Sequence, residues 1–323
     1  MISIHKNKAQ AVQTIFLTDI RNQRSKAIAK LNALYAKTTV HNDRVYLNNV
    51  ILLFVNNPDI LLWDSAKINK NLGVVGNVPL INKTYKNGIT KPVKSPIKNA
   101  IITALDYKVL RSSFYPKYFK EIGIKSCVYC NSQLTITAVK SKGIYSAKFD
   151  VDHYHSKDEY PFLCISLFNL YPACSSCNRA KGTKNIEFEL YTTNPIKTKK
   201  SIYNFKLSSY SKSKYLTTKD SNDIGFTFNE PVYTNPTTKK LNDVFHIENI
   251  YETQVDLIEE LIIKSQIYNK SYLKSLKSNF NKLSLHPELF KRTLIGNYTE
   301  DKDIHKRPMS KLVMDIAKDL GLI

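Results

Sequence analysis

The sequence contains no run of about 18 apolar residues, the length that a membrane-spanning helix needs. Its first ten residues, MISIHKNKAQ, carry positive charge but are followed by no apolar stretch with a small-residue cleavage site. We therefore expect no membrane partner and no secretory leader, and a cytoplasmic location. The hydrophobic content of 42% is still enough for a packed core, which argues against a disordered chain.

Cysteine is also scarce, with five in 323 residues, too few for the disulfide framework of a small secreted domain. Four of them form two Cys-x-x-Cys pairs, Cys127 with Cys130 and Cys174 with Cys177. Two such pairs can supply the four thiolates of a tetrahedral metal site. The fifth, Cys164, lies between two aliphatic residues, and we expect it to be a buried thiol.

Acidic residues are few: 27 Asp and Glu stand against 48 Lys and Arg, a formal charge of +21. The excess is uneven, because residues 1–120 carry 19 basic and 5 acidic side chains, a net charge of +14. Such a region attracts phosphate-bearing polymers, which makes nucleic acid the expected partner. The alternative is a basic face that is merely solvated.

Hydrophobic spacing predicts an α+β protein that is mostly helical, with a central ββα unit. We expect zinc bound by the two cysteine pairs to hold this unit together. We expect a basic, mainly helical region at 1–120, a zinc-bound module at 121–200, and short strands followed by helices at 201–323. The last region has nearly balanced charge and is a candidate surface for a homodimer or another partner.

Within the first region, residues 1–38, 44–70 and 97–120 show helical spacing. Residues 73–96 are rich in Gly, Pro and Lys, and read as a loop that could follow a phosphate backbone. The lysines of this arm are Lys83, Lys86, Lys91 and Lys94, beside Tyr85.

In the central module, residues 134–140 and 144–151 alternate like strands around a Lys142-Gly143 turn. The second cysteine pair then reads as the start of a short helix. Further along the chain, 186–190 and 224–228 look like strands, and helical spacing returns from 240 onward.

Beside the cysteines lie the side chains that phosphodiester hydrolysis requires. His153 can take a proton from water near neutral pH. Asp152 and Asn178 offer a carboxylate and a neutral oxygen to Mg²⁺, and Asn169 can orient the imidazole or brace its loop. Arg179 and Lys181 follow on the expected helix and are candidate contacts to a substrate phosphate, as is Lys184.

The pattern D-x-D-H, then N-L-x-P-x-C-x-x-C-N-x-x-K-G, with C-x-x-C upstream, resembles the motif of HNH (His-Me finger, ββα-metal) endonucleases. The resemblance covers about residues 121–200. It implies that His153 is the general base, that Asn169 is the central asparagine, and that the four cysteines hold a structural Zn²⁺. It also implies that Asp152 and Asn178 bind a catalytic Mg²⁺ or Mn²⁺. Asparagine at 178 makes this an HNN variant.

The sequence departs from the motif at two points. His155 and Ser156 stand where many relatives have an apolar residue and proline. Strand alternation also places Asp152 and His153 on opposite faces unless the strand ends there. The role of Asp150 stays open between support of the metal and a hairpin surface position.

The aromatic-rich segment YPFLCISLFNLYPAC is further similar to HNH subunits of bacterial anti-phage systems of the Septu type. That similarity implies a defence effector acting on DNA with an ATPase subunit as partner. Two alternatives stay open: a non-catalytic zinc protein that binds nucleic acid or acts as a scaffold, and a nuclease that cuts RNA.

Overall fold

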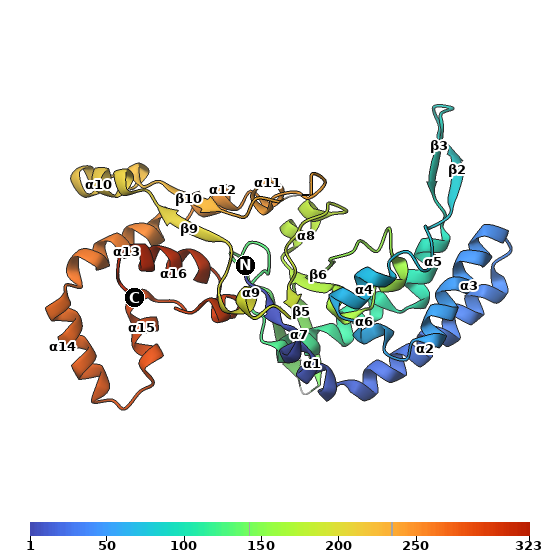
Figure 1. Ribbon diagram of the computed structural model, residues 1–323, viewed down its shortest axis with the longest axis horizontal. Coiled ribbons are helices and arrows are strands. Elements are labelled where there is room, and N and C mark those ends of the chain that lie inside the picture. The colour runs from blue at the N-terminus through green and yellow to red at the C-terminus, as the bar shows by residue number, and fades with distance from the viewer. Residues whose placement is uncertain (142, 234) are drawn as a thin grey trace.

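The computed structural model describes residues 1–141, 143–233 and 235–323 of the chain. The molecule is elongated, with N-terminal helices at one end, C-terminal helices at the other and the central strands between them (Figure 1). Most elements are helices, and the strands form two-stranded sheets. The expected α+β class with a helical majority is therefore confirmed. None of the helices in the described ranges combines the length and the apolar character needed to cross a bilayer.

The N-terminal part is mainly helical, as predicted. Its elements are β1 (Ile4–His5), α1 (Lys6–Ile15), α2 (Leu17–Lys37), α3 (His41–Asn56), the 3-10 helix η1 (Ile60–Leu62), α4 (Ser65–Asn71), α5 (Ile97–Ala104), α6 (Tyr107–Ser113) and α7 (Tyr115–Ile122). The helix expected over the first 38 residues is two helices, because the backbone leaves helical geometry at Phe16. The Phe16 ring packs edge-on against Phe114, with ring centres 5.4 Å apart. On α2, Ile20, Ala27 and Leu31 form the buried stripe that the spacing predicted.

Residues 73–96 contain a β-hairpin, so the predicted loop is wrong. Strand β2 (Leu80–Thr84) pairs antiparallel with β3 (Thr90–Lys94). Asn87 and Gly88 lie in the turn, where Gly88 adopts a φ of +78° that glycine accommodates without strain. An Asn-Gly pair is a strong hairpin signal, but the many prolines and glycines around it concealed the strands.

The central part holds the elements that surround the candidate site. They are β4 (Ile136–Ser141), β5 (Ile144–Lys148), β6 (Asp150–His153), the 3-10 helices η2 (Pro161–Leu163) and η3 (Leu167–Asn169), β7 (Leu170–Ala173) and α8 (Ser175–Lys181). The predicted hairpin exists as β4 and β5, although Lys142 of its turn lies outside the described residues. The strands next to α8 are a different pair, since β6 runs antiparallel to β7. A single residue, Phe149, separates β5 from β6, so the two strands read as one in the sequence.

A second set of short elements follows α8. They are β8 (Tyr191–Thr192), α9 (Pro195–Lys199), β9 (Asn204–Leu207), α10 (Ser209–Thr218), the 3-10 helix η4 (Ser221–Asp223) and β10 (Phe226–Asn229). Strand β8 pairs parallel with β1, and β9 pairs antiparallel with β10. The strand predicted near 224–228 is confirmed as β10, whereas 186–190 forms only an isolated bridge at Ile186.

The C-terminal part is helical, as predicted. It consists of α11 (Leu241–Phe245), α12 (Ile247–Glu252), α13 (Val255–Ile267), α14 (Lys270–Asn281), α15 (Pro287–Ile295), the 3-10 helix η5 (Asp301–Lys306) and α16 (Ser310–Asp319). One hydrophobic cluster runs from Ala9 on α1 to Ala317 on α16. The three regions expected from the sequence therefore share a continuous core, in which β6 and β7 are buried while β4 and β5 stay partly exposed.

Candidate functional site

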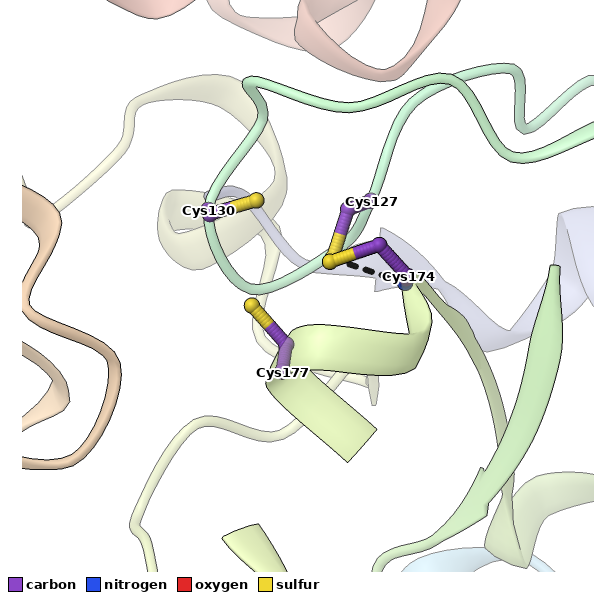
Figure 2. Close-up of side chains that lie close together, drawn as sticks. All are labelled: Cys127, Cys130, Cys174 and Cys177. Atoms are coloured by element: carbon purple, nitrogen blue, oxygen red, sulfur yellow. Dashed lines mark hydrogen bonds between the residues drawn. The ribbon is translucent and has the colours of Figure 1, made fainter. Parts of the chain in front are cut away.

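The four paired cysteines meet at one point, although 43 residues separate the two pairs (Figure 2). Cys127 and Cys130 lie in the loop after α7, while Cys174 caps the N-terminus of α8 and Cys177 lies within it. All four are buried, and their sulfur atoms lie within 4.8 Å of one another. A tetrahedral Zn²⁺ with Zn–S bonds of about 2.3 Å would hold its sulfurs roughly 3.8 Å apart, so the cluster fits this ion.

Hydrogen bonds support the sulfurs in the way that metal ligands usually require. The Cys174 N–H donates to Cys127 Sγ at 3.3 Å, and the Ser132 hydroxyl donates to Cys130 Sγ at 3.1 Å. Hydrogen bonding with Cys127 lowers the pKa of Cys130 and Cys174, whereas burial raises the pKa of Cys127 and hydrogen bonding with Cys127 raises that of Cys177. Cys130 and Cys174 are thereby biased toward the thiolate form that binds metal.

The first cysteine pair is fixed by Asn131, a residue that sequence reasoning missed. Asn131 adopts a left-handed φ of 56° directly after Cys130. Its amide nitrogen donates to the Ile304 carbonyl at 2.8 Å, and its side-chain oxygen accepts the Lys311 N–H at 2.9 Å. The C-terminal part thus clamps the turn that carries two of the sulfurs. The available signal was local, because asparagine tolerates this backbone region better than most residues.

Next to the cysteine cluster is a cavity of about 210 Å³ between β6, α6, the C-terminal end of α8 and the loop after β6. Its lining includes Asp150, Asp152, His153 and Asn178. Strand alternation would place Asp152 and His153 on opposite faces. Strand β6 ends at His153, as their predicted proximity requires, and both residues line the same cavity. The cavity therefore gathers carboxylates, an imidazole and an amide in one place.

His153 is held in one tautomer. Its Nε2 lies 3.1 Å from the Cys164 carbonyl, which can only accept, so Nε2 carries the proton and Nδ1 keeps its lone pair. Burial lowers the pKa of His153 to about 3, and the imidazole is neutral at pH 7. The Tyr107 ring packs beside it with centroids 4.8 Å apart. The Nδ1 lone pair is therefore unprotonated at pH 7, although the same burial weakens the ring as a base.

Asp152 is tied to both halves of the cysteine cluster. One carboxylate oxygen, Oδ2, accepts the Tyr129 hydroxyl at 2.5 Å and lies 3.3 Å from Lys181 Nζ. Tyr129 stands between the first two cysteines, and Lys181 ends the helix that carries Cys177. Burial raises the pKa of Asp152, and the Lys181 charge offsets part of that rise.

Asn178 faces Asp150 as well as the cavity. Its amide nitrogen donates to Asp150 Oδ2 at 3.2 Å, which leaves the amide oxygen as an acceptor. The sequence left Asp150 undecided between supporting a metal and a surface position. The structure places it on the cavity wall next to Asn178.

Asn169 holds the loop that follows the imidazole and does not contact the ring. Its side-chain oxygen accepts the His155 N–H at 2.7 Å, and its amide donates to the carbonyls of His155 and Leu163. Of the two roles considered from sequence, the contacts correspond to bracing the loop. The His155 ring itself packs between Tyr154 and Tyr160.

The phosphate contacts expected on α8 need correction. Lys181 is only 1% exposed, and its ammonium donates to the His153 carbonyl at 2.7 Å, so it is committed within the protein. Arg179 is exposed but lies in the last helical turn, not at an N-terminus. The basic residues that line the cavity are instead Arg111 on α6 and Lys157. Arg111 lies about 40 residues upstream, and no sequence signal linked it to the motif.

Lys181→Ala should destabilise the fold while Arg179→Ala should not. Removing Lys181 leaves Asp152 buried without its counter-charge, a loss of about 3–5 kcal/mol in the free energy of unfolding. The exposed Arg179 should change it by less than about 0.5 kcal/mol. Urea unfolding followed by circular dichroism measures both; equal stability of the two variants would contradict the buried role of Lys181.

Comparison with known proteins gives a partial similarity. Over 69 residues the chain is 35% identical to the Septu protein PtuB of Bacillus thuringiensis, a match that covers 21% of this chain and 24% of that protein. The chain thus matches about a quarter of the length of this relative. No protein-family profile and no solved structure matches the chain.

Proposed function

We propose that the chain is a metal-dependent endonuclease of the HNH class that hydrolyses phosphodiester bonds in DNA. One observation carries the proposal: His153, Asp152 and Asn178 line a single cavity beside a buried four-cysteine cluster. A protein that used zinc only to bind nucleic acid has no need of a desolvated neutral imidazole next to paired carboxylates.

The imidazole of His153 supplies the base. A water molecule in the cavity transfers a proton to Nδ1, since Nε2 is occupied by the Cys164 carbonyl. The water oxygen forms a bond to phosphorus as the bond from phosphorus to the leaving sugar oxygen breaks, and that oxygen is then protonated. Arg111 and Lys157, which also line the cavity, hold the scissile phosphate.

A hard divalent cation fits the remaining donors. Among the described residues no side chain donates a hydrogen bond to Asp152 Oδ1, and Asp152 and Asn178 both line the cavity, so the carboxylate and the Asn178 amide oxygen are available as ligands. Carboxylate and amide oxygens are ligands that Mg²⁺ and Mn²⁺ accept. Such an ion would stabilise the negative charge that develops on the phosphate and the leaving oxygen.

The cysteine cluster has a structural role in this mechanism. With four sulfur ligands it leaves no open position for substrate. Cys177 and Asn178 are neighbours on α8, and Tyr129 lies between the first two cysteines. An ion bound by the four cysteines would hold Asn178 in place through Cys177, and Asp152 in place through Tyr129.

The biological setting that we propose is anti-phage defence with a partner subunit. The similarity to a Septu protein supports this, and the charge of residues 1–120 supports a nucleic-acid substrate. We further propose that the regions 1–120, 121–200 and 201–323 divide the work into substrate binding, cleavage and partner contact, and that an ATPase or a second copy of this chain joins at the third.

The direct test incubates the purified protein with supercoiled plasmid, linear DNA and RNA, each with Mg²⁺, Mn²⁺ or EDTA. We expect cleavage of DNA that requires the divalent ion. Salt-sensitive binding with no cleavage under any of these conditions, with and without a co-expressed ATPase, would favour the binding-only alternative. Cleavage confined to RNA would change the substrate but keep the chemistry.

Tyr129→Phe should weaken catalysis without disrupting the cysteine cluster. The variant loses the hydroxyl that holds Asp152 Oδ2, and loss of such an orienting group typically costs about 10–100-fold in metal affinity or activity. We expect a higher Mg²⁺ concentration for half-maximal cleavage and unchanged zinc content. Tyr154→Phe is the control, because Tyr154 stacks on Tyr171 and its hydroxyl, unlike that of Tyr129, donates no hydrogen bond to Asp152 among the described residues. An unchanged Mg²⁺ requirement in Tyr129→Phe would show that Tyr129 does not position the carboxylate.

A further inference from the structure

We propose that the β2–β3 hairpin is an arm that enters the major groove of duplex DNA and leads the duplex to the cavity. The second half of this statement rests on the proposed nuclease function, whereas DNA binding by the hairpin does not. The arm is defined as Leu80 to Lys94, the two strands and the turn between them.

The arm stands away from the body of the protein (Figure 1). Every residue of β2 is exposed, as are the first three of β3. At about 3.3 Å per residue, five-residue strands reach roughly 16 Å. A hydrogen bond from the Ser95 N–H to the Pro79 carbonyl closes its base, at 2.8 Å. A ribbon of this length buries almost nothing, so the folded core does not explain it.

The charge of the arm is of one sign. Its four lysines face no acid within it, and no Asp or Glu occurs between Asp64 and Asp106. Lys83 and Lys91 lie directly opposite each other in the hairpin, an arrangement that destabilises an isolated sheet. Lys83 Nζ lies 5.4 Å from the centre of the Tyr85 ring. A polyanion bound near Lys83 and Lys91 would relieve the repulsion between their charges.

The base of the arm is joined to the loop that lines the cavity. Lys94 Nζ donates to the Asp158 carbonyl at 3.0 Å and pairs with Glu159, while Lys98 Nζ lies 2.9 Å from Asp158 Oδ1. Asp158 is part of the cavity lining together with His153. These contacts fix the base of the arm relative to the cavity, so a duplex bound by the arm would lie at a fixed distance from the His153 imidazole.

Duplex DNA fits this arm better than duplex RNA does. The major groove of B-form DNA is about 12 Å wide and admits a two-stranded ribbon. The major groove of A-form RNA is deep and narrow, and side chains do not reach its floor. An arm with lysines on both strands can contact phosphates on both sides of the wider groove.

The test measures binding of the full chain to a labelled DNA duplex and to an RNA duplex of the same sequence, by fluorescence anisotropy over a range of salt, in buffer without added Mg²⁺ or Mn²⁺. The variant is K83Q/K86Q/K91Q. The matched control is K274Q/K277Q/K282Q, which removes equal charge from exposed positions at the other end of the molecule. Circular dichroism and zinc content confirm that both variants fold.

We expect the hairpin variant to bind DNA at least about tenfold more weakly, with a salt dependence shallower by about 0.9 for each phosphate that its side chains no longer neutralise. The control should stay within about twofold of the unchanged protein, and RNA should bind more weakly throughout. Equal DNA affinity in both variants would overturn the proposal and leave the lysines as protection against edge-to-edge pairing. Equal binding of RNA would overturn the groove assignment. Because binding is measured without added divalent ion, hairpin-dependent binding by a protein that cleaves nothing in Mg²⁺ would contradict the proposed function alone.

Discussion

Replacing Cys174 with alanine should remove the zinc and unfold the centre of the molecule. The buried cluster would retain three sulfurs, and Cys174 directly precedes α8, the helix that carries Cys177 and Asn178. Zinc at such a site contributes about 10–16 kcal/mol to folding, as much as the whole stability of a typical domain. We expect about one zinc per chain in the unchanged protein, little in the variant, and a melting temperature lower by about 10 °C or more.

Cys164→Ala is the matched control for this experiment. Cys164 is also fully buried but lies outside the cluster, so the substitution should keep the zinc and cost only the packing of one small side chain. Metal content by mass spectrometry and thermal unfolding by circular dichroism distinguish the two variants. A Cys174→Ala protein with normal zinc content and normal melting would show that the cluster is not a metal site.

His153→Ala should reduce the rate of DNA cleavage by about 10²–10⁴-fold while zinc content stays normal. A positioned general base contributes a factor of this size, and among the described residues that line the cavity His153 is the only imidazole. The ring is buried against Tyr107, so its removal lowers stability as well. His153→Gln addresses this difficulty, because a glutamine amide can still donate toward the Cys164 carbonyl while offering no basic nitrogen.

The control for His153 is His286→Ala, at the exposed N-terminus of α15. It should cleave at the rate of the unchanged protein. Single-turnover rates with saturating Mg²⁺ separate loss of the base from loss of metal binding. If His153→Gln folds, binds zinc and cleaves within about twofold of the unchanged protein, then another group takes the proton.

Local chemistry carried most of what the sequence could predict about the site. Two Cys-x-x-Cys pairs are expected to meet because together they supply the four ligands of a tetrahedral site. Asp152 and His153 are expected near each other because they are adjacent in the chain. Asn169 braces the loop at His155, which is one of the two roles that the sequence left open. Helical spacing predicted the N-terminal and C-terminal helices for a similar reason, since a buried stripe such as that of α2 repeats at regular intervals.

Features that depend on distant packing could not be predicted. Lys181 was predicted to contact a phosphate because it lies on the expected helix after the second cysteine pair. Its ammonium is instead buried against Asp152 and the His153 carbonyl. Arg111 reaches the cavity from a helix that the motif does not include. The hairpin of residues 80–94 lacks the alternation of a half-buried strand, because neither face is covered.

Cleavage of supercoiled plasmid tests most directly whether His153 activates water for phosphodiester cleavage beside a divalent cation. Supercoiled plasmid is incubated with the zinc-loaded protein and with its His153→Gln variant, each in Mg²⁺ and in EDTA, and the loss of the supercoiled form is followed over time. We predict cleavage only by the unchanged protein in Mg²⁺. Equal cleavage by the folded, zinc-bound variant would contradict this role of His153.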